Sequence, residues 1–256
     1  MTSPDAQSSA PTSDDRPLKE HPGQIAGIAM REIGAIIGIA GVALGLLAFL
    51  MIADEMQEGE FASIDRSVML ALRNSGDLSQ PIGPHWLVEG MADITALGGY
   101  SVLTLLMAMV FFYLLATRRI QSAFLTIFAV LSGTLMSTML KMFFGRDRPD
   151  LVPHLVDATS ASFPSGHSML SAVSYLTLGV LLAQSHDSKR LRFMLMGYAV
   201  LITVLVGCSR VYLGVHWPTD VLAGWSFGAA WASLWWVIGW GLRRWRSTRQ
   251  QAEPTD

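Results

Sequence analysis

The stretch Ser162–Gln184, SFPSGHSMLSAVSYLTLGVLLAQ, starts with a polar Pro-Ser-Gly-His turn and continues as a long apolar run. A helix rises about 1.5 Å per residue, so about 20 mainly apolar residues are needed to cross a hydrocarbon core about 30 Å thick. The run from residue 168 to 184 approaches that length, and we interpret it as a membrane helix. His167 then lies directly before this membrane helix, and an ionisable side chain at that position needs a chemical explanation.

Composition supports a membrane protein throughout the chain. Of its 256 residues, 51% are hydrophobic and only 15% are charged, a balance typical of membrane proteins. The formal net charge of −2 gives no reason to expect nucleic acid as a partner. Cys208 is the only cysteine, which excludes an intrachain disulfide.

Six apolar runs recur along the sequence. They lie at about 33–53, 98–116, 121–143, 168–184, 193–208 and 219–241. We therefore predict an all-α, polytopic membrane protein with six transmembrane helices, and an even number of spans places both termini on one side.

The remaining segments predict two tails and one cap. Residues 1–24 are rich in Ser, Pro, Asp and Gln and predict a disordered cytoplasmic tail. They do not resemble a cleavable signal peptide, which would have a basic start and an early apolar core. Residues 54–97 are acidic and predict an external cap with short interfacial helices near 64–73 and 86–92. The membrane domain then covers 25–244, and 245–256 form a second cytoplasmic tail.

Lysine and arginine are distributed unevenly between the connecting segments. With cytoplasmic termini, twelve of the eighteen basic residues lie inside, as the positive-inside rule requires. Four of the six outside basic residues crowd at the outer ends of the last four spans. Basic residues at a membrane edge commonly extend to the interface without further function. Here they oppose the charge bias, which suggests that an anion holds them.

The first of three candidate motifs follows the third span and reads Lys141-x6-Arg148-Pro149. Pro149 disfavours helical geometry at Arg148, so the chain turns there and can direct both cations at one point. A guanidinium and an ammonium both suit phosphate oxygens. Alone, this pattern is also typical of a solvated loop.

The second motif is Pro164-Ser165-Gly166-His167. It lies ahead of the fourth span, where a helix N-terminus offers unpaired N–H groups and a positive dipole end to an anion. Gly166 allows an oxyanion to approach the backbone, and His167 projects from the first turn. The alternative is a simple Ser cap beside a packed histidine.

The third motif is Ser209-Arg210-x5-His216-x3-Asp220, between the last two spans. Pro218 suits the first turn of the sixth helix, and Asp220 can reach back four residues to His216. A carboxylate fixes the tautomer of a histidine and leaves its other ring nitrogen free to attack. The alternative is an Asp cap beside an interfacial His-Trp pair.

Six spans place all three motifs at one membrane face. Three cations and a helix N-terminus would there neutralise a phosphoryl group. Together the motifs K-x6-RP, PSGH and SR-x5-H-x3-D resemble the signature of the type 2 phosphatidic acid phosphatase (PAP2) superfamily, which also contains vanadium-dependent haloperoxidases. All three match without a substitution, and the resemblance points to the membrane lipid phosphate phosphatase branch.

The resemblance implies a role for each motif residue. His216 would be the nucleophile that forms a phosphohistidine, Asp220 its orienting partner and His167 the general acid. The phosphate would be held by Lys141, Arg148, Ser165, the Gly166 backbone and Arg210. The resemblance implies no cofactor and no metal, and we see no carboxylate cluster in the sequence that suggests one.

Four other residues near the motifs have simpler interpretations. His154 is expected at the surface. Asp147 and Asp150 are expected in local salt bridges, and Arg146, outside the family pattern, could add to the field around the phosphate.

The predicted function is hydrolysis of a lipid phosphate at the outer face of the cytoplasmic membrane. Candidate substrates are phosphatidic acid, phosphatidylglycerophosphate and undecaprenyl diphosphate. A phosphotransferase could use the same phosphohistidine. A non-enzymatic lipid-binding or transport protein would show broken helices with polar residues at the bilayer midplane, which this sequence lacks. The soluble haloperoxidases do not fit six spans, and oligomeric state cannot be predicted.

Overall fold

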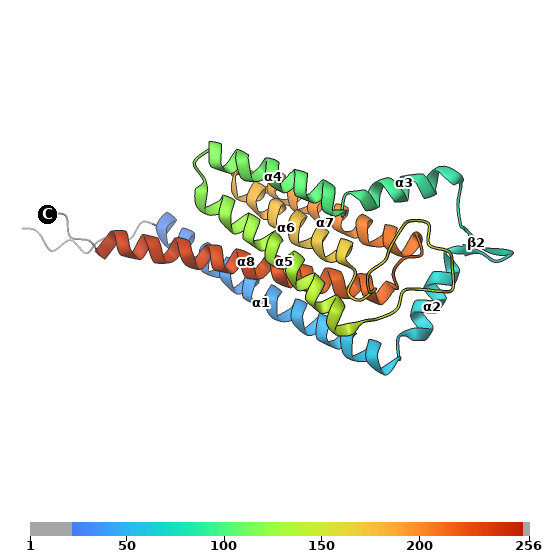
Figure 1. Ribbon diagram of the computed structural model, residues 1–256. Helices are drawn as coiled ribbons and strands as arrows, with labels where there is room; N and C mark the ends of the chain where they lie inside the picture. The colour runs from blue at the N-terminus through green and yellow to red at the C-terminus, as the bar shows by residue number, and fades with distance from the viewer. Residues whose placement is uncertain (1–21, 253–256) are drawn as a thin grey trace, which may run out of the picture.

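The computed structural model describes residues 22–252, with side chains from 33 to 249, as a bundle of long helices with a small cap at one end (Figure 1). The elements in chain order are α1 (Pro22–Glu58), α2 (Ala62–Ala71), β1 (Arg73–Asn74), β2 (Asp77–Pro81), α3 (His85–Ala96), α4 (Tyr100–Ala116), α5 (Ile120–Phe144), α6 (Gly166–Gln184), α7 (Lys189–Tyr212) and α8 (Pro218–Ala252).

The long helices have the length and composition of membrane spans. Within the described residues, α1, α5, α6, α7 and α8 are each long and apolar enough to cross a bilayer. A sixth span arises if α3 and α4, which meet at a 46° bend, are taken as one broken crossing. The predicted fold class, an all-α polytopic membrane protein, is confirmed.

Helix α6 lies at the centre of the bundle, packed between α5, α7 and α8 (Figure 1). Glycines of α8 bring it unusually close to α6. A Cβ at Gly224 would lie 2.7 Å from the Ser165 carbonyl oxygen, and one at Gly228 would lie 2.6 Å from that of Met169. Small residues allow such backbone approach between membrane helices. This contact sets the start of α6 beside the start of α8.

The cap between α1 and α4 holds α2, a two-stranded antiparallel hairpin of β1 and β2, and α3. The predicted short helices near 64–73 and 86–92 correspond to α2 and α3, whereas the all-α prediction missed the hairpin. Two buried groups tie the cap to α7. The Tyr212 hydroxyl donates to the Ile82 carbonyl oxygen (2.7 Å), and Arg73 Nη1 donates to the Tyr212 carbonyl oxygen (3.0 Å).

Helices extend beyond the predicted ends of the membrane domain. Helix α1 starts at Pro22, so residues 22–24 of the predicted 1–24 tail are helical. Helix α8 continues to Ala252, so most of the predicted 245–256 tail is helical as well. Residues 1–21 and 253–256 lie outside the described residues.

Candidate active site

The three motifs meet at the capped end of the bundle. Lys141 lies in the last turn of α5, and Gly166 and His167 are the first two residues of α6. Arg210 lies in the last turn of α7, and Asp220 lies in the first turn of α8. The connecting segments supply Arg148, Ser165 and His216. The structure thus brings together every residue that the sequence predicted for the site.

His216 and Asp220 form the contact that their four-residue spacing predicted. His216 Nδ1 lies 3.4 Å from Asp220 Oδ2, and both side chains are buried. The same Asp220 oxygen accepts the Trp217 backbone N–H at 2.9 Å. On the other side of the ring, Arg148 Nη1 lies 3.4 Å from His216 Nε2. A guanidinium can only donate and a carboxylate can only accept, so the contacts favour a tautomer with the proton on Nδ1 and a lone pair on Nε2.

The surroundings of His216 keep it neutral. Burial lowers the pKa of His216 well below its usual range, and the positive charges of Lys141, Arg210 and Arg148 lower it further. Both effects act in one direction because a buried imidazolium is poorly solvated and is repelled by cations. The unprotonated Nε2 therefore faces a cluster of positive charge.

Lys141 and Arg148 each use part of their hydrogen-bonding capacity to hold the loop between α5 and α6. Lys141 Nζ donates to the Ala161 carbonyl oxygen (2.5 Å), and Arg148 Nε donates to that of Ser160 (2.7 Å). Gly145 turns the chain out of α5 in the left-handed conformation, with φ 58°, which glycine adopts without steric cost. Helix α5 ends at Phe144, one residue beyond the predicted span 121–143, and Gly145 makes the turn out of the helix.

The backbone N–H groups at the start of α6 receive no side-chain cap. Ser165 occupies the N-cap position, but its side chain makes no capping hydrogen bond; its hydroxyl accepts from Ser168 Oγ at 2.9 Å. The first N–H groups of a helix have no partner within the helix, so this N-terminus keeps its capacity to bind an anion. A Cβ at Gly166 would lie 3.3 Å from Lys141 Cε. The aliphatic part of the Lys141 side chain therefore packs against the Gly166 backbone.

His167 and Arg210 complete the same side of the site. His167 is partly buried beside the bend between α3 and α4, where a Cβ on Gly99 would lie 3.8 Å from His167 Nε2. Arg210 Nη1 donates to Thr95 Oγ1 of α3 at 3.0 Å. Within the described part of the chain, Arg210 Nε is buried without a hydrogen-bond partner. An unpaired buried donor is costly, and a phosphate oxygen would satisfy it.

Arg146 behaves differently from the expectation that it adds to the phosphate's field. Its guanidinium pairs with two buried carboxylates, Asp220 Oδ1 at 2.6 Å and Asp65 Oδ2 at 2.7 Å. Sequence reasoning missed Asp65. It is one of several acidic residues in the cap and lies 81 positions from Arg146, so no local pattern marks it.

Expectations for the neighbouring residues are partly met. His154 is exposed as predicted, and its Nε2 contacts the Pro149 carbonyl oxygen at 2.8 Å. Among the described residues, neither Asp147 nor Asp150 forms the predicted salt bridge, because Arg146 pairs with Asp65 and Asp220 instead.

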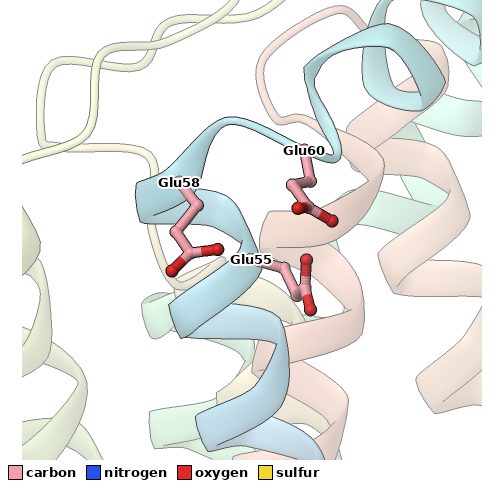
Figure 2. Close-up of side chains that lie close together, drawn as sticks. All are labelled: Glu55, Glu58 and Glu60. Atoms are coloured by element: carbon pink, nitrogen blue, oxygen red, sulfur yellow. The ribbon is translucent and has the colours of Figure 1, made fainter.

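A carboxylate cluster that the sequence did not suggest lies at the end of α1. Oxygens of Glu55, Glu58 and Glu60 lie within 4.8 Å of one another (Figure 2). Glu58 and Glu60 are exposed. Exposed acidic groups of this kind are common without a bound ion, and we assign no metal to them.

Comparison with known proteins identifies the family. A model of the PAP2 superfamily matches residues 122–244. Phosphatidylglycerophosphatase B of Bacillus subtilis (strain 168) is 36% identical over 190 residues, which cover 71% of this chain and 86% of that protein. The chain belongs to the PAP2 superfamily.

Two further similarities agree with this PAP2 assignment. The crystal structure of a transmembrane PAP2-type phosphatidylglycerolphosphate phosphatase from Bacillus subtilis matches with a TM-score of 0.70 and 33% identity, over 79% of this chain and 96% of that one. An undecaprenyl-diphosphatase of Sulfolobus acidocaldarius is 43% identical over 76 residues, covering 30% of this chain and 32% of that protein. The protein is thus a multi-pass membrane phosphatase of the PAP2 superfamily.

The PAP2 match extends across all three motifs, from Lys141 to Asp220, but not over the cap. Asp65 therefore lies outside the matched family region although it reaches into the motif cluster.

Proposed function

We propose that this PAP2 protein hydrolyses the phosphomonoester or diphosphate of a lipid through a phosphohistidine on His216. One observation carries the proposal: His216 contacts Asp220 through Nδ1 and turns Nε2 toward Arg148. A neutral imidazole held by a carboxylate and facing cations suits attack on a phosphoryl group.

In the first step, the Nε2 lone pair of His216 attacks phosphorus and the bond to the leaving oxygen breaks. Protonated His167 donates its proton to that oxygen, so a lipid alcohol leaves neutral and a lipid monophosphate leaves with one negative charge less. The charge on the three equatorial oxygens is balanced by Lys141, Arg148 and Arg210, while the first turn of α6, from Gly166 onward, offers backbone N–H groups.

In the second step, water attacks the phosphohistidine and the N–P bond breaks. His167, now neutral, accepts the proton of the attacking water, and inorganic phosphate leaves. Both histidines then regain their starting states. The proposed cycle uses no metal and no cofactor, because its charge is balanced by side chains of the chain itself.

Phosphatidylglycerophosphate is the first substrate to test. A relative at 36% identity and a solved structure at 33% identity both carry this activity in their names, and the undecaprenyl-diphosphatase relative makes a polyprenyl diphosphate the second. The distribution of lysine and arginine supports cytoplasmic termini, with the site at the outer face of the cytoplasmic membrane.

The test is phosphate release by the purified protein in detergent with EDTA present. Phosphatidylglycerophosphate, phosphatidic acid and undecaprenyl diphosphate are compared, for the wild type and His216→Ala. We expect release by the wild type only, and the relative kcat/KM values identify the substrate. Release by His216→Ala at the wild-type rate would refute the mechanism. Transfer of phosphate to an added lipid alcohol in place of water would identify a phosphotransferase.

A further inference from the structure

Arg146 lies between the catalytic cluster and the cap. It comes from the loop after α5, and its side chain is mostly buried. Nη1 donates to Asp220 Oδ1 (2.6 Å) and to Thr219 Oγ1 (2.8 Å), whereas Nη2 donates to Asp65 Oδ2 (2.7 Å). One guanidinium thus joins the proposed orienting carboxylate of α8 to a carboxylate of α2.

The two oxygens of Asp220 have separate partners. Oδ1 is held by Arg146, and Oδ2 accepts the Trp217 N–H and faces His216 Nδ1. A carboxylate fixed through one oxygen cannot rotate freely about its side-chain bond. The direction in which Oδ2 points at His216 is therefore set by the Arg146 contact at Oδ1 together with the Trp217 N–H at Oδ2.

Asp65 is in turn fixed by the first turn of α8. Its Oδ1 accepts the Thr219 backbone N–H (3.0 Å), and its Oδ2 accepts the Thr219 hydroxyl (2.6 Å). Its side chain is only 1% exposed. A buried carboxylate is tolerated when it is paired and hydrogen-bonded, and Asp65 has Arg146 as its cation partner and Thr219 as its second hydrogen-bond donor.

We propose that Arg146 and Asp65 are positioning residues for the phosphoryl transfer: together they hold Asp220 so that it orients His216. The proposal rests on the function proposed above and extends the site beyond the three motifs into the cap. It also gives the cap a role in catalysis, since α2 supplies one end of the chain Asp65–Arg146–Asp220–His216.

The contacts also predict an electrostatic effect on His216. Its charged neighbours are Lys141, Arg148 and Arg210, with Asp220 behind it and His167 within electrostatic range. Arg146 balances the charge of Asp220. When Arg146 is replaced, the negative charge of Asp220 is no longer compensated. An uncompensated negative charge beside His216 favours its protonated, imidazolium form.

The test compares Arg146→Gln, Asp65→Asn and the double variant with Arg73→Gln as matched control. Arg73 is also a buried arginine that ties the cap to the bundle, but its contacts are backbone carbonyl oxygens and not Asp220. For Arg146→Gln we expect kcat to fall about 10- to 100-fold, by analogy with loss of the residue that orients a metal-binding histidine, with KM little changed. For Arg73→Gln we expect a lower melting temperature and an unchanged kcat.

The double variant separates positioning from stability. Arg146→Gln leaves Asp65 buried without a cation, which destabilises the fold, and Asp65→Asn removes that charge. We expect the double variant to recover melting temperature relative to Arg146→Gln but to keep its low kcat. Recovery of kcat together with stability, or an equal loss of kcat in Arg73→Gln, would overturn the proposal.

A second readout does not depend on turnover. Nitrogen-15 NMR of labelled histidine reports the tautomer and titration of His216 in the folded, detergent-solubilised protein. We expect Arg146→Gln to shift the titration of His216 to higher pH and Arg73→Gln to leave it unchanged. An unchanged titration in Arg146→Gln would contradict the proposal, whereas absence of phosphate release by the wild type would refute only the proposed function.

Discussion

At the residue scale, the basic side chains of the site each have two tasks. Lys141 and Arg148 hold the loop between α5 and α6 through the carbonyl oxygens of Ala161 and Ser160, and both act electrostatically on His216. Loop carbonyls alone do not balance a full positive charge. The cluster is therefore preorganised to receive an anion without rearrangement, which is the main requirement for stabilising a transition state electrostatically.

The role of His167 predicts a dependence on the leaving group. In His167→Ala, turnover of a lipid phosphate should fall about 10²- to 10⁴-fold, the usual contribution of a general acid. An aryl phosphate with an acidic phenol needs no protonation, so His216 should still be phosphorylated. We expect stopped-flow measurements to show a burst of phenolate close to one equivalent, followed by slow turnover. A burst in His216→Ala would contradict the assignment of the nucleophile.

The neutral state of His216 predicts how stability depends on pH. Its pKa in the folded protein lies well below the usual value because of burial and nearby cations, whereas the unfolded chain binds a proton near pH 6.5. The unfolded state then carries more protons below about pH 6.5, so the free energy of unfolding falls as pH falls. Melting temperatures between pH 8 and 5 should decrease with acidity.

His216→Asn should make this dependence less steep, since the variant has lost one of the titrating groups. His85→Asn removes a histidine whose side chain is largely exposed and serves as the matched substitution. Equal slopes in the wild type and His216→Asn would show that His216 does not determine the acid sensitivity.

At the element scale, the close packing of α6 against α8 connects the second and third motifs. The Ser165 backbone N–H donates to the Asp220 carbonyl oxygen at 2.9 Å, and Gly224 lies one turn further along α8. Phe163 is fully buried against Phe49 and Phe144, with ring centroids 5.9 and 4.8 Å away. The Pro-Ser-Gly-His segment is therefore fixed from both sides.

Gly224→Ala should disturb this junction. The added Cβ would lie 2.7 Å from the Ser165 carbonyl oxygen, so a backbone must move. Overpacking of this kind costs about 1–3 kcal/mol, and we expect a lower melting temperature together with a reduced kcat. Gly241→Ala on the same helix is the control, since a Cβ there meets no heavy atom within 4 Å. Loss of activity in both variants would show that the junction is not the cause.

At the scale of the whole molecule, the site and the cap lie at one end of the bundle. The ends of α5 and α7 and the starts of α6 and α8 converge there, beside α2 and α3 (Figure 1). The loop between α6 and α7 lies at the other end, because α6 starts at the site and runs away from it. Because α6 is a membrane span, its two ends lie on opposite sides of the membrane.

This arrangement predicts the outcome of cysteine labelling in intact cells. In a Cys208→Ser background, Ser75→Cys in the exposed hairpin turn of the cap should react with a membrane-impermeant maleimide. Asp187→Cys in the exposed loop between α6 and α7 should react only after permeabilisation. The reverse pattern would place the site on the cytoplasmic side and contradict the proposed orientation.

Local sequence features were sufficient to predict several parts of this protein. Apolar length predicted the membrane helices because spanning a bilayer is a one-dimensional requirement. The His216–Asp220 contact followed from four-residue spacing in one turn, and the motif spacings identified the family. The predicted roles of His167 and of the phosphate-binding residues remain predictions that the experiments above test.

Other features were decided only by the tertiary structure. The bend between α3 and α4 and the pairing of Arg146 with Asp65 and Asp220 were not predicted, and the pairing joins segments far apart in the chain. Periodicity and spacing report the nearest turn of a helix, whereas a buried charge is satisfied by whichever carboxylate the packing brings to it. Arg146, seen from the sequence, is one more cation near a phosphate site; packing of the cap makes it the partner of two carboxylates.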